Sequence, residues 1–280
     1  MKTGLVMEGG AMRGLFTAGV IDVMMEEGID YDGTIGVSSG AAFGCNYKSR
    51  QPGRVIRYNI RFATEPRFCS LRSWILTGDL YGAEFCYHTM PNDLDYWDVE
   101  TFRRNPQEFW IVCTDVMTGK PVYYQCKTGD ETELDLIRAS ASMPVFSRPV
   151  EYQGRRFLDG GISDSIPLRF FQKKGYDRNV VILTQPDGYF KRASKLAPAL
   201  ELVLRKYPAV ARRLRQRYKV YNRQLAYVLD QEQRGNTFVI RPPHKLEIGK
   251  IEHDPNKMRQ VYETGRQTAE ACMKELKRFL

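Results

Sequence analysis

The stretch that decides the fold runs from Ile35 to Cys45 and reads Ile-Gly-Val-Ser-Ser-Gly-Ala-Ala-Phe-Gly-Cys. Its apolar first residues favour a strand, whereas the small residues after Gly40 favour a helix. Between them lies a Gly-x-Ser-x-Gly motif, formed by Gly36, Val37, Ser38, Ser39 and Gly40. The two glycines lack Cβ atoms, so the strand and the helix can approach closely around Ser38. We interpret Ser38 as an exposed nucleophile on a sharp turn; a serine that only caps the helix is the alternative.

A glycine-rich loop precedes this motif in the chain. Thr3–Met7 is expected to be a buried strand, and it leads into Glu8-Gly9-Gly10-Ala11-Met12-Arg13-Gly14 and a helical pattern that ends near Gly28. The next strand is expected at Tyr31–Val37, and this order predicts parallel strands with right-handed crossovers. Loops that follow parallel strands meet at one edge of the sheet. The backbone amides of residues 9–14 can therefore form an oxyanion hole beside the serine.

The same loop has a second interpretation, as a dinucleotide-binding loop. Ala11 stands where the Gly-x-Gly-x-x-Gly fingerprint requires its second glycine, and no acidic residue clearly ends the following strand. We therefore disfavour a nucleotide cofactor. Arg13 is interpreted as orienting the loop, with an anionic substrate contact or a solvated helix position as alternatives.

A third motif supplies a carboxylate. A short strand, Arg155–Leu158, runs into Asp159-Gly160-Gly161, which a plain hairpin turn also explains. A serine nucleophile needs a base within hydrogen-bond distance. A triad would place its histidine after the acid, in a loop beyond a late strand, and of the three histidines only His244, after Pro242-Pro243, roughly fits this position. Otherwise an Asp can act as the base if burial raises its pKa, and Asp159 is the preferred candidate.

Length and charge set the broad class. A chain of 280 residues with 42% hydrophobic content suits one large α/β domain with a helical appendage. We expect a catalytic domain over residues 1–185 and a basic helical C-terminal extension over 186–280. The formal net charge of +9 suggests an anionic partner, either lipid headgroups or nucleic acid, although a basic surface without a partner is the alternative.

Two segments combine basic residues with apolar or aromatic ones. Residues 191–223 hold eleven basic residues against one acid, Glu201, with leucines and valines interspersed. This pattern fits basic helices on an anionic membrane, or a solvated helical face. Residues 51–97 interleave arginines with aromatic residues, which suits either nucleic acid or irregular helices that pack aromatic rings inward over the site. We favour the second interpretation, so nucleic acid is not an expected partner.

The remaining pattern predicts further elements. Strands are expected at 109–114 and 120–126, joined by a hairpin turn, and later at 180–184 and 237–241. Helices are expected at 133–141 and 256–280.

The cysteines and the apolar runs indicate the compartment. Six cysteines without a Cys-x-x-Cys pair are typical of reduced thiols in a cytoplasmic protein. The apolar run after Lys2 is too short for a secretory signal, and no run approaches the roughly 20 residues that span a bilayer. We expect a cytoplasmic protein with possible peripheral contact at a membrane.

In this order, the motifs at 9–14, 36–40 and 159–161 resemble the patatin-like phospholipase family, specifically its bacterial members, over about residues 3–185. The resemblance implies a three-layer α/β/α fold with a mostly parallel central sheet. It also implies a Ser38–Asp159 dyad without histidine and an oxyanion hole around Gly10 and Ala11. The implied reaction is hydrolysis of fatty-acyl esters in phospholipids, lysophospholipids or neutral lipids, without a metal or other cofactor. A non-catalytic module that binds anionic membranes on this scaffold is the alternative.

Two features depart from the family pattern. The family commonly has a third glycine where Ala11 stands, and it often has Asn before Pro after the Asp-Gly-Gly turn. Here the corresponding residues are Ser163-Asp164-Ser165-Ile166-Pro167.

Overall fold

A central sheet organises the molecule. The computed structural model describes residues 1–196 and 198–280 in full, and the helical backbone at Ala197. The strand order is β5-β6-β3-β2-β1-β7-β8, with β4 also paired to β3. The parallel pairs join β1 (Lys2–Met7), β2 (Gly33–Val37), β3 (Glu108–Asp115), β7 (Tyr176–Ile182) and β8 (Thr237–Ile240). The antiparallel pairs involve β4 (Pro121–Cys126), β5 (Val150–Tyr152) and β6 (Arg155–Asp159).

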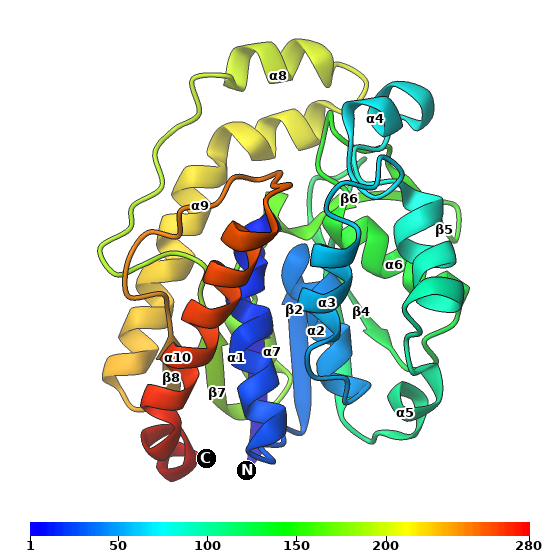
Figure 1. Ribbon diagram of the computed structural model, residues 1–280. Helices are drawn as coiled ribbons and strands as arrows, with labels where there is room; N and C mark the ends of the chain where they lie inside the picture. The colour runs from blue at the N-terminus through cyan, green and yellow to red at the C-terminus, as the bar shows by residue number, and fades with distance from the viewer.

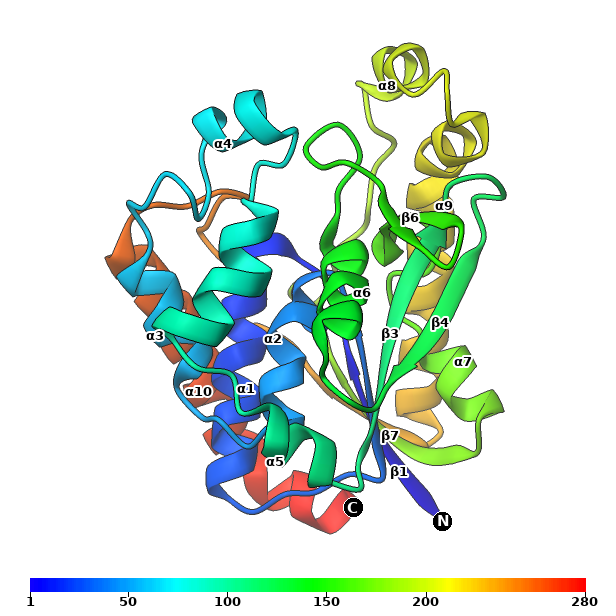
Figure 2. The same cartoon turned by 90° about the vertical axis from the view of Figure 1, so that its right-hand side faces the viewer.

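Helices cover both faces of this sheet (Figure 1, Figure 2). One face carries α1 (Gly14–Glu26), α2 (Ser39–Lys48), α3 (Arg54–Arg61), α5 (Val99–Arg104), α6 (Glu131–Ala141) and α10 (Pro255–Phe279). The other carries α7 (Leu168–Lys173) and α9 (Pro208–Gln233). Strand side chains alternate between two cores: Leu5 and Met7 of β1 face the first, and Val6 faces the second. The predicted three-layer α/β/α fold is confirmed.

The segment after residue 185 is built into this architecture. β8 extends the sheet beside β7, and α10 packs along α1. α9 follows a short helix, α8 (Ala197–Val203), and covers the second core with Tyr221 and Val228. The helical extension predicted for the C-terminal part is present. The predicted domain boundary between residues 185 and 186 stays a prediction. Strand β8, which follows this boundary, belongs to the same sheet as the strands that precede it.

The predicted elements are present with shifted ends. The strand expected at 180–184 begins earlier, at Tyr176, and the hairpin of β3 and β4 forms as expected. Residues 51–97 form irregular helices, with α4 (Leu71–Thr77) and the π-helix η2 (Phe85–Leu94) after α3. Several of their aromatic rings pack inward, and Phe62 and Phe85 meet edge to face at 5.3 Å, whereas Trp74 and Tyr96 are exposed.

Asp22 gives the fold a pH-dependent contact between α1 and α10. It is 1% exposed, and its Oδ2 accepts hydrogen bonds from the Gly53 amide at 2.8 Å and the Tyr262 hydroxyl at 2.7 Å. Burial raises the pKa of Asp22 to about 6. The folded pKa therefore lies above the unfolded value, so the folded state binds more protons in this interval. This contribution to stability is present below the unfolded pKa and is lost as the pH rises through about 6.

We expect Asp22→Asn to remove this pH dependence, because the amide keeps an oxygen acceptor and does not titrate. The free energy of unfolding of the variant should improve relative to the original protein by up to about 3 kcal/mol between about pH 4 and about pH 7. Urea denaturation across this range measures the difference. Asp177→Asn, at an exposed position of β7, is the control. A difference between Asp22→Asn and the original protein that stays constant with pH would contradict the assignment.

Candidate active site

Ser38 occupies a strained turn between β2 and α2. Its backbone angles are φ 56° and ψ −122°, a region that non-glycine residues rarely adopt and that costs about 1–3 kcal/mol. The flanking glycines permit this turn. A Cβ on Gly36 would lie 2.2 Å from the Gly40 carbonyl oxygen, and one on Gly40 would lie 2.4 Å from that of Met7. This strand–turn–helix geometry, with a strained serine between close-packed glycines, is typical of a nucleophile elbow.

Strand β3 brings Ser38 and Asp159 to neighbouring positions. Val112 of β3 pairs with Val37 at the end of β2, and the next residue, Cys113, pairs with Asp159 at the end of β6. The Ser38 hydroxyl interacts with the Asp159 carboxylate and lowers its pKa.

The end of α6 holds both members of this pair. The Ser140 hydroxyl donates to the Val112 carbonyl at 2.7 Å and accepts from the Ser38 amide at 3.1 Å. Two residues later, the Ser142 carbonyl accepts from the Asp159 amide at 2.8 Å. Sequence reasoning missed Ser140. The only local signal was a small-residue run at a helix end, which does not distinguish one serine from another.

Asp159 is a buried carboxylate, 5% exposed, at the start of the turn η3 (Gly160–Ile162). Its Oδ1 accepts a hydrogen bond of 2.7 Å from the Gly161 amide, and Gly160 packs over Val112. Burial raises the pKa of Asp159, and this effect outweighs the lowering by Ser38, Arg217 and the Gly161 amide. A carboxylate with a raised pKa is a better proton acceptor than an ordinary surface aspartate.

The residues after this turn are held by α9. Asp164 accepts hydrogen bonds from the Tyr123 hydroxyl at 2.6 Å and from Gln224 Nε2 at 2.7 Å. The Ser165 hydroxyl donates to the Gly161 carbonyl at 2.9 Å. The Ser-Asp-Ser run that departs from the family pattern is therefore fully engaged in supporting the turn that carries Asp159.

The glycine-rich loop lies against the elbow. Gly9 packs on Ser38, and Gly14 packs on Ser39. The Gly10 amide donates to the Ser39 hydroxyl at 2.9 Å, so it is not free for a substrate, contrary to the expectation for this residue. Ala11 has φ 51°, in the left-handed region.

Two amides of the loop remain available. Within the part of the chain that the structure describes, the amides of Ala11 and Met12 have no hydrogen-bond partner. Both residues line the same pocket as Ser38. The next side chain is Arg13, whose Nε is buried and has no hydrogen-bond partner among the described residues, and its role in orienting the loop stays a prediction.

Glu8 anchors the start of this loop. It is 2% exposed and accepts hydrogen bonds from the Thr184 amide at 2.7 Å and the Tyr221 hydroxyl at 2.8 Å. Burial raises the pKa of Glu8. The loop is thereby tied to the end of β7 and to α9. The sequence pattern gave no sign of this role, because the partners lie about 180 and 210 residues away.

An apolar pocket opens at Ser38. Its walls come from α2, α3, η2, α6 and the turns between them, and they are mostly aliphatic and aromatic. The lining includes Ala42, Phe43, Tyr58, Phe68, Leu80, Tyr81, Tyr87, Met90, Leu134, Ile137 and Met143. Such a pocket can hold a hydrocarbon chain whose carbonyl end reaches the serine.

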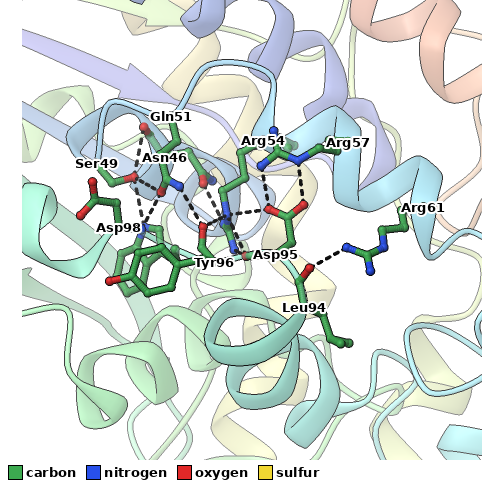
Figure 3. A network of polar contacts seen from close by, with 12 residues as sticks. Asn46, Ser49, Gln51, Arg54, Arg57, Arg61, Leu94, Asp95, Tyr96 and Asp98 are labelled. Carbon is green, nitrogen blue, oxygen red and sulfur yellow. Dashed lines mark hydrogen bonds and ion pairs between the residues drawn. The ribbon is translucent and has the colours of Figure 1, made fainter.

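A buried polar network fixes one wall of this pocket. Arg54 donates to the Asn46 side chain at 2.9 Å and to the Asp95 and Tyr96 carbonyls. Arg57 forms a bidentate pair with Asp95, with both distances at 2.8 Å. Figure 3 shows these side chains converging on the residues that follow η2. Arg54 and Arg57 therefore support the fold of this segment, and the expectation that it does not bind nucleic acid stays a prediction.

The basic segment at 191–223 is only partly a surface. Arg217 of α9 donates to the Gly161 carbonyl, and Arg213 donates to that of Gly119 at 2.9 Å. His244, the alternative base, is exposed and makes no hydrogen bond within the described residues. In the same described part of the chain, none of the helices has the length and hydropathy needed to pass through a bilayer.

Comparison with known proteins identifies two regions. A model of the patatin-like phospholipase family matches residues 5–171, and a model of a domain of unknown function, DUF6363, matches residues 207–280. An Escherichia coli protein, "Uncharacterized protein YjjU", is 32% identical over 231 residues, which is 72% of this chain and 60% of that protein. "Lysophospholipase NTE1" of Kluyveromyces lactis is 29% identical over 179 residues, 61% of this chain but 12% of that protein.

One solved structure also aligns with this chain. VipD from Legionella pneumophila aligns over 98% of this chain and 67% of its own, with a TM-score of 0.47 and 11% identity. The family model covers more than half of this chain, from the first strand through the Asp-Gly-Gly turn. The chain therefore belongs to the patatin-like phospholipase family.

Proposed function

We propose that this protein is a serine acyl hydrolase that cleaves fatty-acyl esters of lipids through Ser38 and Asp159. Family membership supports lipid ester hydrolysis in general. The observation that carries the residue assignment is the register on β3, where Val37 and Asp159 pair with consecutive residues. The strained backbone at Ser38 and the raised pKa of Asp159 are both expected of a reacting pair.

The proposed reaction has two steps. Asp159 takes the proton of the Ser38 hydroxyl while its oxygen attacks the ester carbonyl, and the amides of Ala11 and Met12 stabilise the oxyanion. The tetrahedral intermediate collapses to an acyl-enzyme, and Asp159 returns the proton to the leaving alcohol. Asp159 then deprotonates a water molecule that attacks the acyl-enzyme, and it passes this proton to the Ser38 oxygen as the fatty acid leaves, which restores both residues.

We assign the acyl chain to the apolar pocket. The end of the molecule that carries α4 and α8 suits contact with a membrane. In both views α4 and α8 lie at the same end of the molecule (Figure 1, Figure 2). Ile75 and Leu76 of α4 are 75% and 69% exposed, and Leu202 of α8 is 73% exposed. Exposed apolar side chains near basic residues favour peripheral contact with an anionic lipid surface.

Labelling with a fluorophosphonate probe tests the function. We expect one covalent adduct per chain, mapped to Ser38 by peptide mass spectrometry, because the probe reacts with activated serines. A panel of phospholipids, lysophospholipids, acylglycerols and p-nitrophenyl esters then identifies the substrate class. The non-catalytic alternative predicts binding to phosphatidylglycerol vesicles without labelling or turnover, and that result would overturn the proposal.

A further inference from the structure

Four positively charged side chains belong to segments that form or contact the proposed site. We call Arg13, Lys191, Arg217 and Lys250 the cationic cluster. Arg217 contacts the Gly161 carbonyl in the turn whose amide binds Asp159. Arg13 follows the two loop amides assigned to the oxyanion. The cluster therefore adjoins both the base and the oxyanion hole of the proposed mechanism.

Lys191 is fixed in place by α9. Its backbone amide and carbonyl each form a hydrogen bond of 2.9 Å with the Asn222 side chain. Its Nζ lies 4.6 Å from the centre of the Tyr221 ring, whose hydroxyl holds Glu8. Lys250 approaches from the loop after β8 and acts on the pKa values of both Lys191 and Asp159. Its carbonyl accepts from Tyr81, a residue that lines the apolar pocket.

The positive charges of the cluster are not neutralised by ion pairs. Among residues 1–196 and 198–280, no carboxylate lies within 4.0 Å of a charged nitrogen of any of the four side chains. The facing carboxyls are Glu8 and Asp159, and burial raises the pKa of each, which disfavours their negative forms. Burial, Arg217, Arg13 and Lys250 together lower the pKa of Lys191 to about 8, against the opposing effect of Glu8. The site therefore holds surplus positive charge, which an anion would relieve.

We propose that the cationic cluster binds the phosphate group of a phosphate-bearing lipid substrate, an inference that rests on the proposed function. Guanidinium and ammonium groups supplied by separate elements suit a phosphate with several acceptor oxygens. The apolar pocket lies on the α2 and α6 side of Ser38, whereas Arg217 comes from α9 on the opposite face of the sheet (Figure 2). An acyl chain in the pocket and an ester at Ser38 therefore leave the headgroup on the side of the cluster. A free fatty acid would instead place its carboxylate at Ser38 itself.

This inference gives the C-terminal part of the chain a role in recognition. Lys191, Arg217 and Lys250 all follow residue 185, and the last two lie in the region matched by the domain of unknown function. The patatin-like part of the chain would supply the reacting groups and the acyl pocket. The following part would supply most of the charge that selects the headgroup.

The test compares two substrates with the same acyl chain: a lysophosphatidic acid and a monoacylglycerol. We expect a higher kcat/KM for the phosphate-bearing lipid, and we expect Lys191→Gln and Lys250→Gln each to lower the ratio of the two values about tenfold. Lys250 is exposed, so its variant carries little risk of misfolding. Lys219→Gln, an exposed position of α9 outside the cluster, is the charge-matched control and should leave the ratio unchanged.

The outcomes separate this inference from the proposed function. If both lipids are hydrolysed and the ratio of their kcat/KM values is the same in Lys191→Gln, Lys250→Gln and the original protein, the headgroup inference is overturned. The proposed function would be unaffected by this result. If Lys219→Gln lowers the ratio as much as the cluster variants do, the effect comes from general surface charge, and the headgroup inference is overturned as well. Equilibrium binding of the same two lipids to Ser38→Ala provides a readout that needs no turnover, with the same preference expected. Binding of inorganic phosphate without a preference for the lipid phosphate would overturn the headgroup assignment.

Discussion

Replacing Ser38 with alanine is expected to lower kcat for ester hydrolysis by on the order of 10⁴-fold or more, close to the uncatalysed background. The substitution removes the oxygen that would form the acyl-enzyme and leaves the Cβ atom, so the strained turn is kept. The oxyanion amides and the apolar pocket are also unchanged, and any residual rate would come from them. Initial rates with a p-nitrophenyl ester and with the best lipid of the panel measure the loss, and circular dichroism and thermal melting establish that the variant is folded.

Ser39→Ala is the matched control for this experiment, because it changes the adjacent serine of the same motif. The Ser39 hydroxyl accepts the Gly10 amide, so its loss leaves a buried donor unpaired and costs about 1–3 kcal/mol of stability. We expect this variant to be less stable but still labelled at Ser38. Turnover that survives in Ser38→Ala, or an adduct mapped to Ser39, would remove the assigned role.

The parts of the site that depend on local sequence were predictable. A strand followed by Gly-x-Ser-x-Gly and a small-residue helix leaves few options for the backbone at Ser38, since Gly36 and Gly40 would both clash if they had side chains. The hydrophobic alternation of the strands likewise set the two cores of the sheet. These features depend on residues that are neighbours in the chain.

The parts that depend on pairing between distant segments were not predictable from the patterns. Nothing around Asp159 specifies that β6 pairs with the end of β3, and this pairing sets its distance from Ser38. Glu8 is held by Thr184, which follows β7, and by Tyr221 of α9, and both are far away in sequence. The run of basic residues at 191–223 suggested the same role for all of its members. In the structure, however, Arg217 points inward and contacts the Asp-Gly-Gly turn. Charge density alone does not show which side of a helix faces the site.

Asp159→Asn is expected to lower kcat by about 10³- to 10⁴-fold, because the amide cannot accept the proton of Ser38. The change is nearly isosteric, and the side-chain oxygen can still accept the Gly161 amide, so the turn should be retained. Steady-state rates measure the loss. Probe labelling of Ser38 should slow in proportion, because it needs the same proton transfer.

The pH profile distinguishes a base from a residue that only shapes the turn. The base must be ionised, so kcat/KM of the original protein should rise as the pH increases through the pKa of Asp159 and level off above it. Because burial raises this pKa, the acid limb should lie above the range of an ordinary aspartate. In Asp159→Asn the limb should vanish from the residual activity.

Asp164→Asn tests whether any buried carboxyl nearby would produce the same limb. Burial also raises the pKa of Asp164, and it lies five residues after Asp159, but its partners are Tyr123 and Gln224 and not Ser38. An asparagine there cannot accept both hydrogen bonds without reorganisation, so stability should fall while the acid limb remains. If the limb instead persists in Asp159→Asn and disappears in Asp164→Asn, proton transfer must pass through the second carboxyl, and the register on β3 would then explain only how the turn is built.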